Sequence, residues 1–501
     1  MSENRSTITR LFKDLSLYTL EPIVFKLISF ILIPIYTGFL LPAEYGILQF
    51  IISMGTFLRS ITQMGLNTGF WKTKNELPES ELKNLSFTVL FTQLLIGFII
   101  LFLLVGTVSL GNKGIVGYGL IAYFIALLIK LVSESYLLMC RAIHKPKLYL
   151  LISLSQSIIL FLLNILFITK FHLGIFGAIT GYVTAFSISS LIYFPIMRKE
   201  VFGKFSIKLS KELLVFGAPL LIGNLSILLL SISDRWFLKW LSTGEQLGLY
   251  GYGYKFSDLI ATFIVYTFQL AWTPIAWKIF TTEDGKRLYH KMENLVVVLF
   301  PVLTFIFIPP ILALVYIMTK NPSYYDGLKI IFLISFSHVF YGFYSFNSTK
   351  NFYYNKKKNV IIANIIAAAL NFILNILLIP TWGMMGAAYA TIISYIGMFI
   401  IIEMVKIEEL REYKSIKWKQ YVFLIVAVSL VLVCTQLFDH SFSWFVISMF
   451  SFLCAISLVS LNFILGIFAW ADIVKFKKGY LTLRKPAKAP PITNQSDSNE
   501  G

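Results

Sequence analysis

The chain has 501 residues, of which 57% are hydrophobic, 16% aromatic and only 14% charged, and its mean hydropathy is +0.77. A soluble protein carries about 25% charged residues, so the composition excludes a soluble globular protein and predicts an all-α protein that crosses a membrane many times. The net charge of +18 would suggest nucleic-acid binding in a soluble protein, and the positions of the charges decide against that interpretation here.

Fourteen apolar stretches are each long enough for a transmembrane helix, which needs about 20 residues. Glu21 and Lys26 interrupt the first stretch and no small-residue cleavage site follows it, so we expect it to remain as a membrane helix and not as a cleaved signal peptide. In chain order the predicted spans are 15–40, 43–67, 85–108, 115–139, 148–169, 174–197, 212–238, 246–274, 292–318, 325–349, 359–380, 384–405, 420–438 and 442–470.

The basic residues gather on alternate connections between these spans. The N-terminus and every second connection, including the tail after residue 474, hold 33 of the 43 Lys and Arg residues. By the positive-inside rule, this bias predicts cytoplasmic termini and an even number of spans. The positive charge is thus a topology signal and a contact with lipid headgroups, and we expect no nucleic-acid partner. The other connections hold only Lys113, Lys170, Lys239 and Lys320.

Residues 144–194 and 355–404 are two versions of one segment. Each has a basic turn, an apolar helix ending in Asn-Ile-Leu (from Asn164 and from Asn375), a second turn and a Gly-x-x-Gly-Ala helix start. Paired halves are typical of transporters that rock around a central site. We therefore predict two six-helix lobes related by a parallel repeat, followed by a C-terminal helix pair. The predicted boundaries are 1–197 for the N-lobe, 198–211 for a cytoplasmic linker, 212–406 for the C-lobe, 407–473 for the helix pair and 474–501 for a basic, disordered tail.

Motifs of enzymes and of cofactor or metal sites are missing from the sequence. The three cysteines, Cys140, Cys434 and Cys454, have no paired spacing, and the five histidines are scattered without metal-ligand spacing. There is no Walker A loop and no nucleophile elbow. We therefore expect no catalytic residues, no metal, no cofactor and no enzymatic activity.

Charged side chains inside the predicted spans are functional candidates, because an ionisable group in lipid is costly. The charges taken as candidates lie on the spans 15–40, 43–67, 115–139, 212–238 and 246–274, which predicts a shared aqueous cavity. The candidates are Glu21, Lys26, Arg59, Lys130, Glu134, Asp234, Arg235, Lys255 and Asp258.

Helical spacing separates two possible ion pairs from this set. Lys130 and Glu134 lie four residues apart and Lys255 and Asp258 three apart, so each pair can be neutralised on one helix face. A structural ion pair and a role in substrate binding both remain open for these four residues.

The remaining charges leave an excess of cations. Arg59 has no acid within one helical turn, and Arg235 shares a face with Lys239, whereas Asp234 projects about 100° away from Arg235. A positive cavity selects an anion, and the planar fork of Arg suits phosphate. We therefore predict substrate contact by Arg59 and Arg235. For Lys26 and Lys239, contact with substrate and an interfacial position of the ammonium group remain alternatives.

Three stretches near residues 233–256 resemble the O-antigen flippase-type polysaccharide exporters, within the superfamily that includes multidrug and toxin extrusion transporters and the lipid II flippase. They are Ser233-Asp234-Arg235-Trp236-Phe237-Leu238, Gly248-Leu249-Tyr250 and Tyr254-Lys255-Phe256. The resemblance implies a fourteen-helix, two-lobed protein of the bacterial inner membrane. It further implies translocation of undecaprenyl-pyrophosphate-linked oligosaccharide units for O-antigen, capsule or similar polysaccharide, with a polymerase and glycosyltransferases as partners.

Such exporters use a cationic cavity and ion gradients. Lys130 and Lys255 are further candidate substrate-binding cations, with the ion-pair alternative open. The ion gradients of such exporters make Glu21, Asp234, Asp258 and Glu134 candidate ion-coupling acids. An ion-coupled multidrug exporter on the same scaffold is the main alternative, but it would need an unpaired acid in its cavity. A polysaccharide polymerase or membrane glycosyltransferase would need a larger loop than the roughly 20 residues that this sequence offers.

Overall fold

The structure is a computed structural model that describes residues 28, 30–111, 114–280, 283–407, 410, 417–439 and 443–468. Every regular element in these ranges is helical, which confirms the predicted all-α fold. Eleven of the described helices are long and apolar enough to cross a membrane. The predicted number of fourteen spans, the repeat and the domain boundaries remain predictions.

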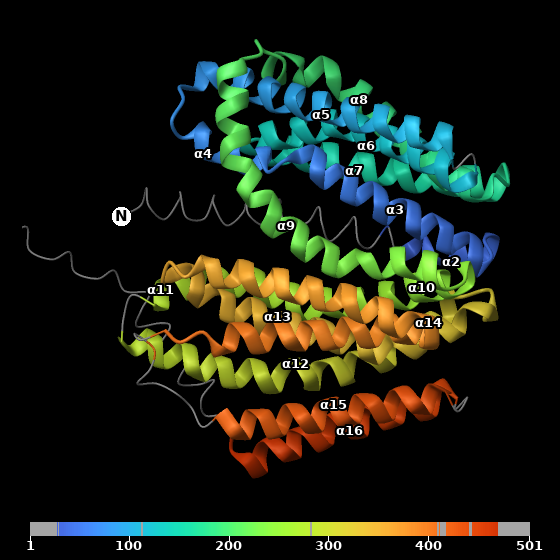
Figure 1. Cartoon of the computed structure of the whole chain (residues 1–501), viewed down its shortest axis with the longest axis vertical. Coiled ribbons are helices and arrows are strands. Elements are labelled where there is room, and N and C mark those ends of the chain that lie inside the picture. Colours follow the sequence, from blue (N-terminus) through green and yellow to red (C-terminus); the bar gives the residue numbers. More distant parts are fainter. Residues whose placement is uncertain are drawn as a thin grey trace, which may run out of the picture.

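A first group of helices forms one side of the molecule (Figure 1). Helix α6 is its centre and packs against α3, α5, α7 and α8. Met64 and Gly65 both have positive φ values and separate α3 from α4, so the chain turns there without leaving the group. The elements are α2 Ile33–Phe39, α3 Pro42–Gln63, α4 Leu66–Lys74, η1 Glu79–Glu81, α5 Leu82–Leu110, α6 Ile115–Ala142, α7 Pro146–Ile165, η2 Leu166–Lys170 and α8 Gly174–Val201.

A second group follows, reached through α9, which runs from the first group to the second and packs on both α3 and α14 (Figure 1). Helix α14 has 48 residues, about 70 Å of helix, far more than a bilayer core of about 30 Å. It bends at Gly383, whose φ of 53° and ψ of −129° are not helical. The elements are α9 Ile207–Leu241, α10 Gly244–Ala261, η3 Thr262–Tyr266, α11 Thr267–Ile279, α12 Glu283–Met318, η4 Pro322–Ile330, α13 Ile331–Tyr353 and α14 Lys357–Met404.

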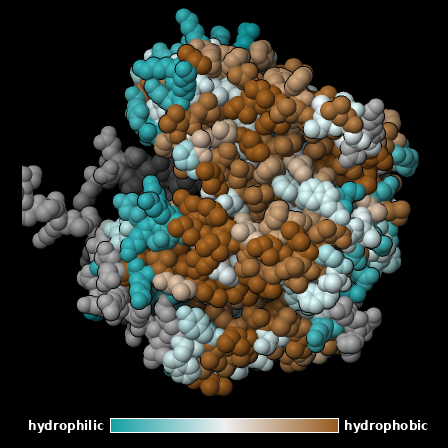
Figure 2. All heavy atoms as spheres, viewed as in Figure 1, coloured by the Kyte–Doolittle hydropathy of each residue, from teal (hydrophilic) through white to brown (hydrophobic). Residues whose placement is uncertain are grey.

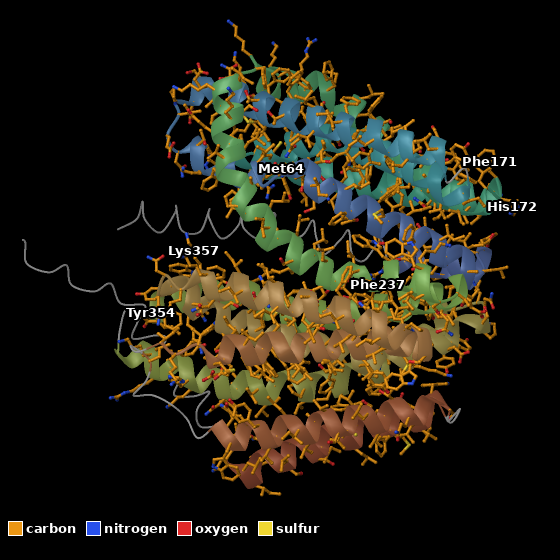
Figure 3. The ribbon with its side chains drawn as sticks, in the orientation of Figure 1. Met64, Phe171, His172, Phe237, Tyr354 and Lys357 are labelled. Carbon is orange, nitrogen blue, oxygen red and sulfur yellow. The ribbon has the colours of Figure 1, made fainter. Side chains whose placement is uncertain are left out.

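The last two helices, α15 Lys417–Asp439 and α16 Trp444–Leu465, form a hairpin on the outside of the second group (Figure 1). Helix α16 packs on α12, and α15 packs on α13. Hydrophobic residues cover most of the visible face of the molecule (Figure 2). Two turns that are predicted to lie on opposite sides of the membrane also lie at opposite ends of the molecule. Phe171 and His172 are at one end, and Tyr354 and Lys357 are at the other (Figure 3).

The two groups touch where α3 and α10 begin. A Cβ atom on Gly248 would lie 1.8 Å from the carbonyl oxygen of Pro42, and one on Gly46 would lie 2.3 Å from that of Gly244. Only glycine allows the two backbones to approach this closely. By the predicted topology, this contact closes the molecule at its non-cytoplasmic end.

We predict that Gly248→Ala lowers the thermal unfolding midpoint, because the added methyl group must push α10 away from Pro42. Overpacking of this kind costs about 1–3 kcal/mol. Gly106→Ala in α5 is the matched control, because no atom lies within 4 Å of its Cβ position. Thermal melts of both variants in one detergent measure the difference, and equal midpoints would contradict the close contact.

Candidate functional site

A cavity of about 470 Å³ lies between the two groups of helices. Its wall combines apolar, aromatic and charged side chains from α2, α3, α9, α10, η3, α13 and α14. Three of the predicted site residues line it, namely Arg235, Lys255 and Asp258. The structure thus brings together charges that lie on two successive helices, α9 and α10, at the interface between the groups.

Arg235 is buried in the cavity wall and held by neutral partners. Its Nη1 donates to the main-chain oxygen of Ser231 at 3.0 Å, and its guanidinium lies 4.6 Å from the ring centroid of Tyr254. The next residue, Trp236, donates from Nε1 to Ser53 Oγ at 3.2 Å and so ties this part of α9 to α3. Among the described residues, no acid forms an ion pair with Arg235, which leaves its positive charge available to a ligand.

Lys255 is the second cation of the wall, and its environment differs from the ion pair that its spacing allowed. Its Nζ lies 5.5 Å from the ring centroid of Tyr36 and 5.4 Å from that of Tyr45, both in the first group. The other member of the possible pair, Asp258, has Oδ1 4.0 Å from His338 Nε2 on α13. Helical spacing made a Lys255–Asp258 pair possible, but Lys255 instead turns across the interface to aromatic rings.

Asp234 is fully buried and faces away from the cavity. Oδ2 accepts hydrogen bonds from Tyr250 and from Thr391 Oγ1 at 2.7 Å, and Oδ1 accepts from Asn371 Nδ2 at 3.2 Å and Asn375 Nδ2 at 2.8 Å. All four donors are neutral, and no cation of the described chain forms an ion pair with this carboxylate. A buried charge needs hydrogen bonds or a counter-charge, and these four donors supply the hydrogen bonds.

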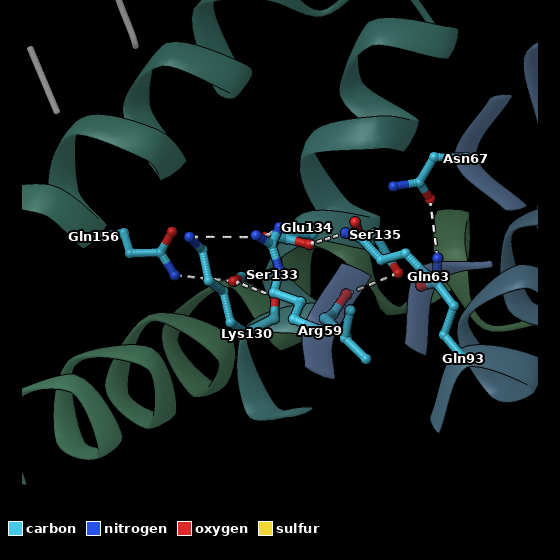
Figure 4. A network of polar contacts seen from close by, with 10 residues as sticks. Arg59, Gln63, Asn67, Gln93, Lys130, Ser133, Glu134, Ser135 and Gln156 are labelled. Atoms are coloured by element: carbon cyan, nitrogen blue, oxygen red, sulfur yellow. Dashed lines mark hydrogen bonds and ion pairs between the residues drawn. The ribbon is translucent and has the colours of Figure 1, made fainter. Parts of the chain in front are cut away.

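Arg59 was predicted to be an unneutralised cation, and this prediction is wrong. Its guanidinium forms an ion pair with Glu134 on α6, which also accepts from Gln63 Nε2 at 3.1 Å (Figure 4). Lys130 Nζ lies 3.7 Å from the same carboxylate, so the ion pair that the i,i+4 spacing allowed does form. Two cations therefore share one acid, and Arg59 lies three residues after Thr56, which lines the cavity, whereas the cluster itself does not.

The remaining candidates lie elsewhere. Lys239 is in the last turn of α9 and does not line the cavity, which agrees with the interfacial alternative. Glu21 and Lys26 lie outside the described residues.

Sequence reasoning missed several polar side chains on apolar helices. His338 on α13 lines the cavity, and Asn371 and Asn375 on α14 hold Asp234. A signal for Asn375 was present in the repeat, where it corresponds to Asn164. Asn164 accepts from Tyr36 on α2 at 3.0 Å, so each of the two asparagines ties its helix to a polar side chain of α2 or α9.

The fold is shared with solved structures of flippases and multidrug transporters. A structure of the lipid II flippase MurJ in an inward closed conformation is 16% identical, with a TM-score of 0.69 over 91% of this chain and 99% of that one. An inward-facing multidrug resistance transporter of the MATE family is 16% identical, with a TM-score of 0.59 over 78% of this chain and 96% of that one. The Vibrio cholerae MATE transporter VcmN is 17% identical, with a TM-score of 0.53 over 82% and 98%. These identities establish the fold alone.

A family model described as polysaccharide biosynthesis protein matches residues 11–280, more than half of the sequence. The chain therefore belongs to this family. Two uncharacterized membrane proteins of Methanocaldococcus jannaschii are similar to it. One is 25% identical over 255 residues, which are 47% of this chain and 59% of that protein. The other is 23% identical over 288 residues, 54% of this chain and 55% of that protein, so the matched regions span little more than half of either relative.

We predict that Glu134→Gln destabilises the protein, because Arg59 and Lys130 then lose their shared counter-charge. Removing one partner of a buried pair costs about 3–5 kcal/mol of stability. We expect a loss at the lower end of this range, because the side chains of Arg59 and Glu134 are 26% and 18% exposed. The double variant Arg59→Met/Glu134→Leu should recover part of the loss. Thermal melts of the wild type, Glu134→Gln and the double variant measure these differences. A double variant with a lower unfolding midpoint than Glu134→Gln would contradict the assigned pair.

Proposed function

We propose that this protein is a flippase that moves undecaprenyl-pyrophosphate-linked oligosaccharide units across the plasma membrane for the synthesis of surface polysaccharide, such as O-antigen or capsule. The polysaccharide biosynthesis family and the fold shared with flippases support a lipid-linked cargo. The proposal includes a bacterial inner membrane, cytoplasmic termini, and a polymerase and glycosyltransferases as partners that supply and use the cargo.

The observation that carries the proposal is the pair of cations in the inter-group cavity. Arg235 and Lys255 both line it, and neither has an acidic partner among the described residues. Arg presents a planar set of donors that can hold two phosphate oxygens at once. A cationic drug would meet like charges at Arg235 and Lys255, and this repulsion disfavours the multidrug alternative.

The cavity can serve transport because it lies between groups of helices that can part. The α3–α10 contact closes the non-cytoplasmic end, so we assign this conformation to loading from the cytoplasmic side. Cargo that enters reaches the cations before that contact opens. Release follows when α3 and α10 separate, in the alternating-access scheme of two-lobed transporters.

We predict that Arg235→Ala abolishes export of surface polysaccharide and makes lipid-linked saccharide accumulate on the inner leaflet. Arg235→Lys should restore export only in part, because an ammonium group cannot hold two phosphate oxygens with a planar fork. Mass spectrometry of extracted lipid-linked saccharides, together with quantification of surface glycan, measures both effects.

The matched control is Lys239→Gln, which removes a like charge four residues along α9 but outside the cavity, and we expect near-normal export. Normal export by Arg235→Ala at confirmed expression would refute the assigned role. Unchanged glycan with altered sensitivity to cationic drugs would favour the multidrug exporter.

Ion coupling is assigned to Asp234 among the predicted coupling acids. Glu134 is already neutralised by Arg59 and Lys130, and Asp258 lies near His338. Asp234 alone of these three is a carboxylate with four neutral donors, and those donors come from both α10 and α14. A cation that binds or leaves Asp234 would therefore change how α9 packs against both helices.

We predict that Asp234→Asn uncouples transport from the ion gradient. The amide keeps the size of the side chain but removes the charge that attracts the cation. In proteoliposomes, wild-type translocation should accelerate when a sodium or proton gradient is imposed, and the variant should show one low rate in either condition. A variant that still responds to the gradient would remove Asp234 from the coupling step, whereas Arg235 would keep its role.

A further inference from the structure

A second and larger cavity, of about 1000 Å³, lies between α13, the second half of α14 and α15. It shares no lining residue with the cavity at Arg235. Most of its wall is apolar, and Ile400 and Ile425 are 49% and 65% exposed. In a bilayer, apolar side chains exposed at a cavity open to the hydrocarbon are covered by lipid chains, because no water is present there to fill the space.

One end of this cavity is charged. Lys350, Glu403 and Lys406 line it together with His290. Lys350 Nζ lies 3.9 Å from Glu403 Oε2 and 5.7 Å from the ring centroid of Tyr289. Glu403 thus pairs with Lys350 and leaves Lys406 as the excess cation of this lining, which suits a phosphate group.

A third lysine extends the charged rim. Lys356 Nζ donates to the main-chain oxygen of Lys406 at 2.9 Å, so the start of α14 and the segment after its end are joined beside the cavity. Lys356 and Lys406 belong to two of the basic connections that are predicted to face the cytoplasm. Basic pockets between transmembrane helices on this side of a membrane bind anionic lipid headgroups.

The charges are not needed to attach the hairpin. Helix α15 is linked to α12 by the hydrogen bond from Gln420 Nε2 to Asn294 Oδ1, and α16 by that from Ser451 Oγ to the main-chain oxygen of Phe305 at 2.7 Å. Lys350 contacts α12 and α14 through Tyr289 and Glu403. The cavity therefore stays open beside a hairpin that is already attached.

We infer that an anionic phospholipid of the cytoplasmic leaflet binds in this cavity, with its phosphate at Lys350 and Lys406 and its acyl chains against Phe399, Ile400 and Ile425. The lipid would fill the space between α14 and α15, beside a hairpin that other contacts already attach to the second group of helices. This site is separate from the proposed path of the cargo.

The test uses the purified full-length chain in nanodiscs made from phosphatidylcholine with a minor share of phosphatidylglycerol, followed by native mass spectrometry. We expect retained phosphatidylglycerol to be enriched over its share of the nanodisc. Lys406→Gln should reduce the enrichment about five-fold, the effect of one lysine on an anionic headgroup. Ser429→Phe, which fills the cavity from its exposed wall, should reduce binding of both lipids.

Lys358→Gln is the matched control, because Lys358 is exposed on the same basic face and does not line the cavity. It should retain the enrichment, as should Arg235→Ala, which separates this site from the proposed transport function. Absence of enrichment in the wild type, or an equal loss in Lys358→Gln and Lys406→Gln, would overturn the inference. Displacement of phosphatidylglycerol by added undecaprenyl phosphate would also overturn it, since the site would then belong to the cargo.

Discussion

A buried guanidinium group that has no acidic partner in the described part of the chain is the constraint on which the rest of the architecture depends. Charge in this environment is costly unless it is hydrogen-bonded or paired. The protein meets that cost for Arg235 with a main-chain oxygen on its own helix and the face of Tyr254. Neither contact cancels the positive charge. In the proposed function this charge serves an anionic cargo, a role that a salt bridge would have prevented.

The neighbouring acid would be the obvious partner, and the geometry of α9 prevents this. Consecutive residues on a helix project about 100° apart, so Asp234 and Arg235 face different environments. Asp234 points to α10 and α14, where Tyr250, Asn375 and Thr391 surround it. One helical step thus places two opposite charges in two separate sites, one open to the cavity and one closed.

The sequence allowed prediction of features that depend on local spacing or on composition. The helical fold, the intramembrane charges and the Lys130–Glu134 pair all follow from patterns within one segment. The Arg59–Glu134 pair joins residues 75 positions apart, and no pattern within one helix could reveal it. For Lys255, helical spacing permitted a pair with Asp258 that does not form. Aromatic rings of the first group contact its ammonium group instead. Contacts between helices decide such cases.

The charges differ between the two sides of the molecule, and this difference has a mechanical consequence. In the first group, Arg59 and Lys130 each have an acidic partner, because both are held by Glu134. Arg235 and Lys255, for which the described residues offer no ion pair, belong to α9 and α10 of the second group. Lys255 nevertheless rests on Tyr36 and Tyr45 of the first. Parting the groups must break these cation–ring contacts, each worth about 0.5–2 kcal/mol. A phosphate that draws Lys255 away would offset that cost, so an anionic cargo itself would ease the opening that releases it.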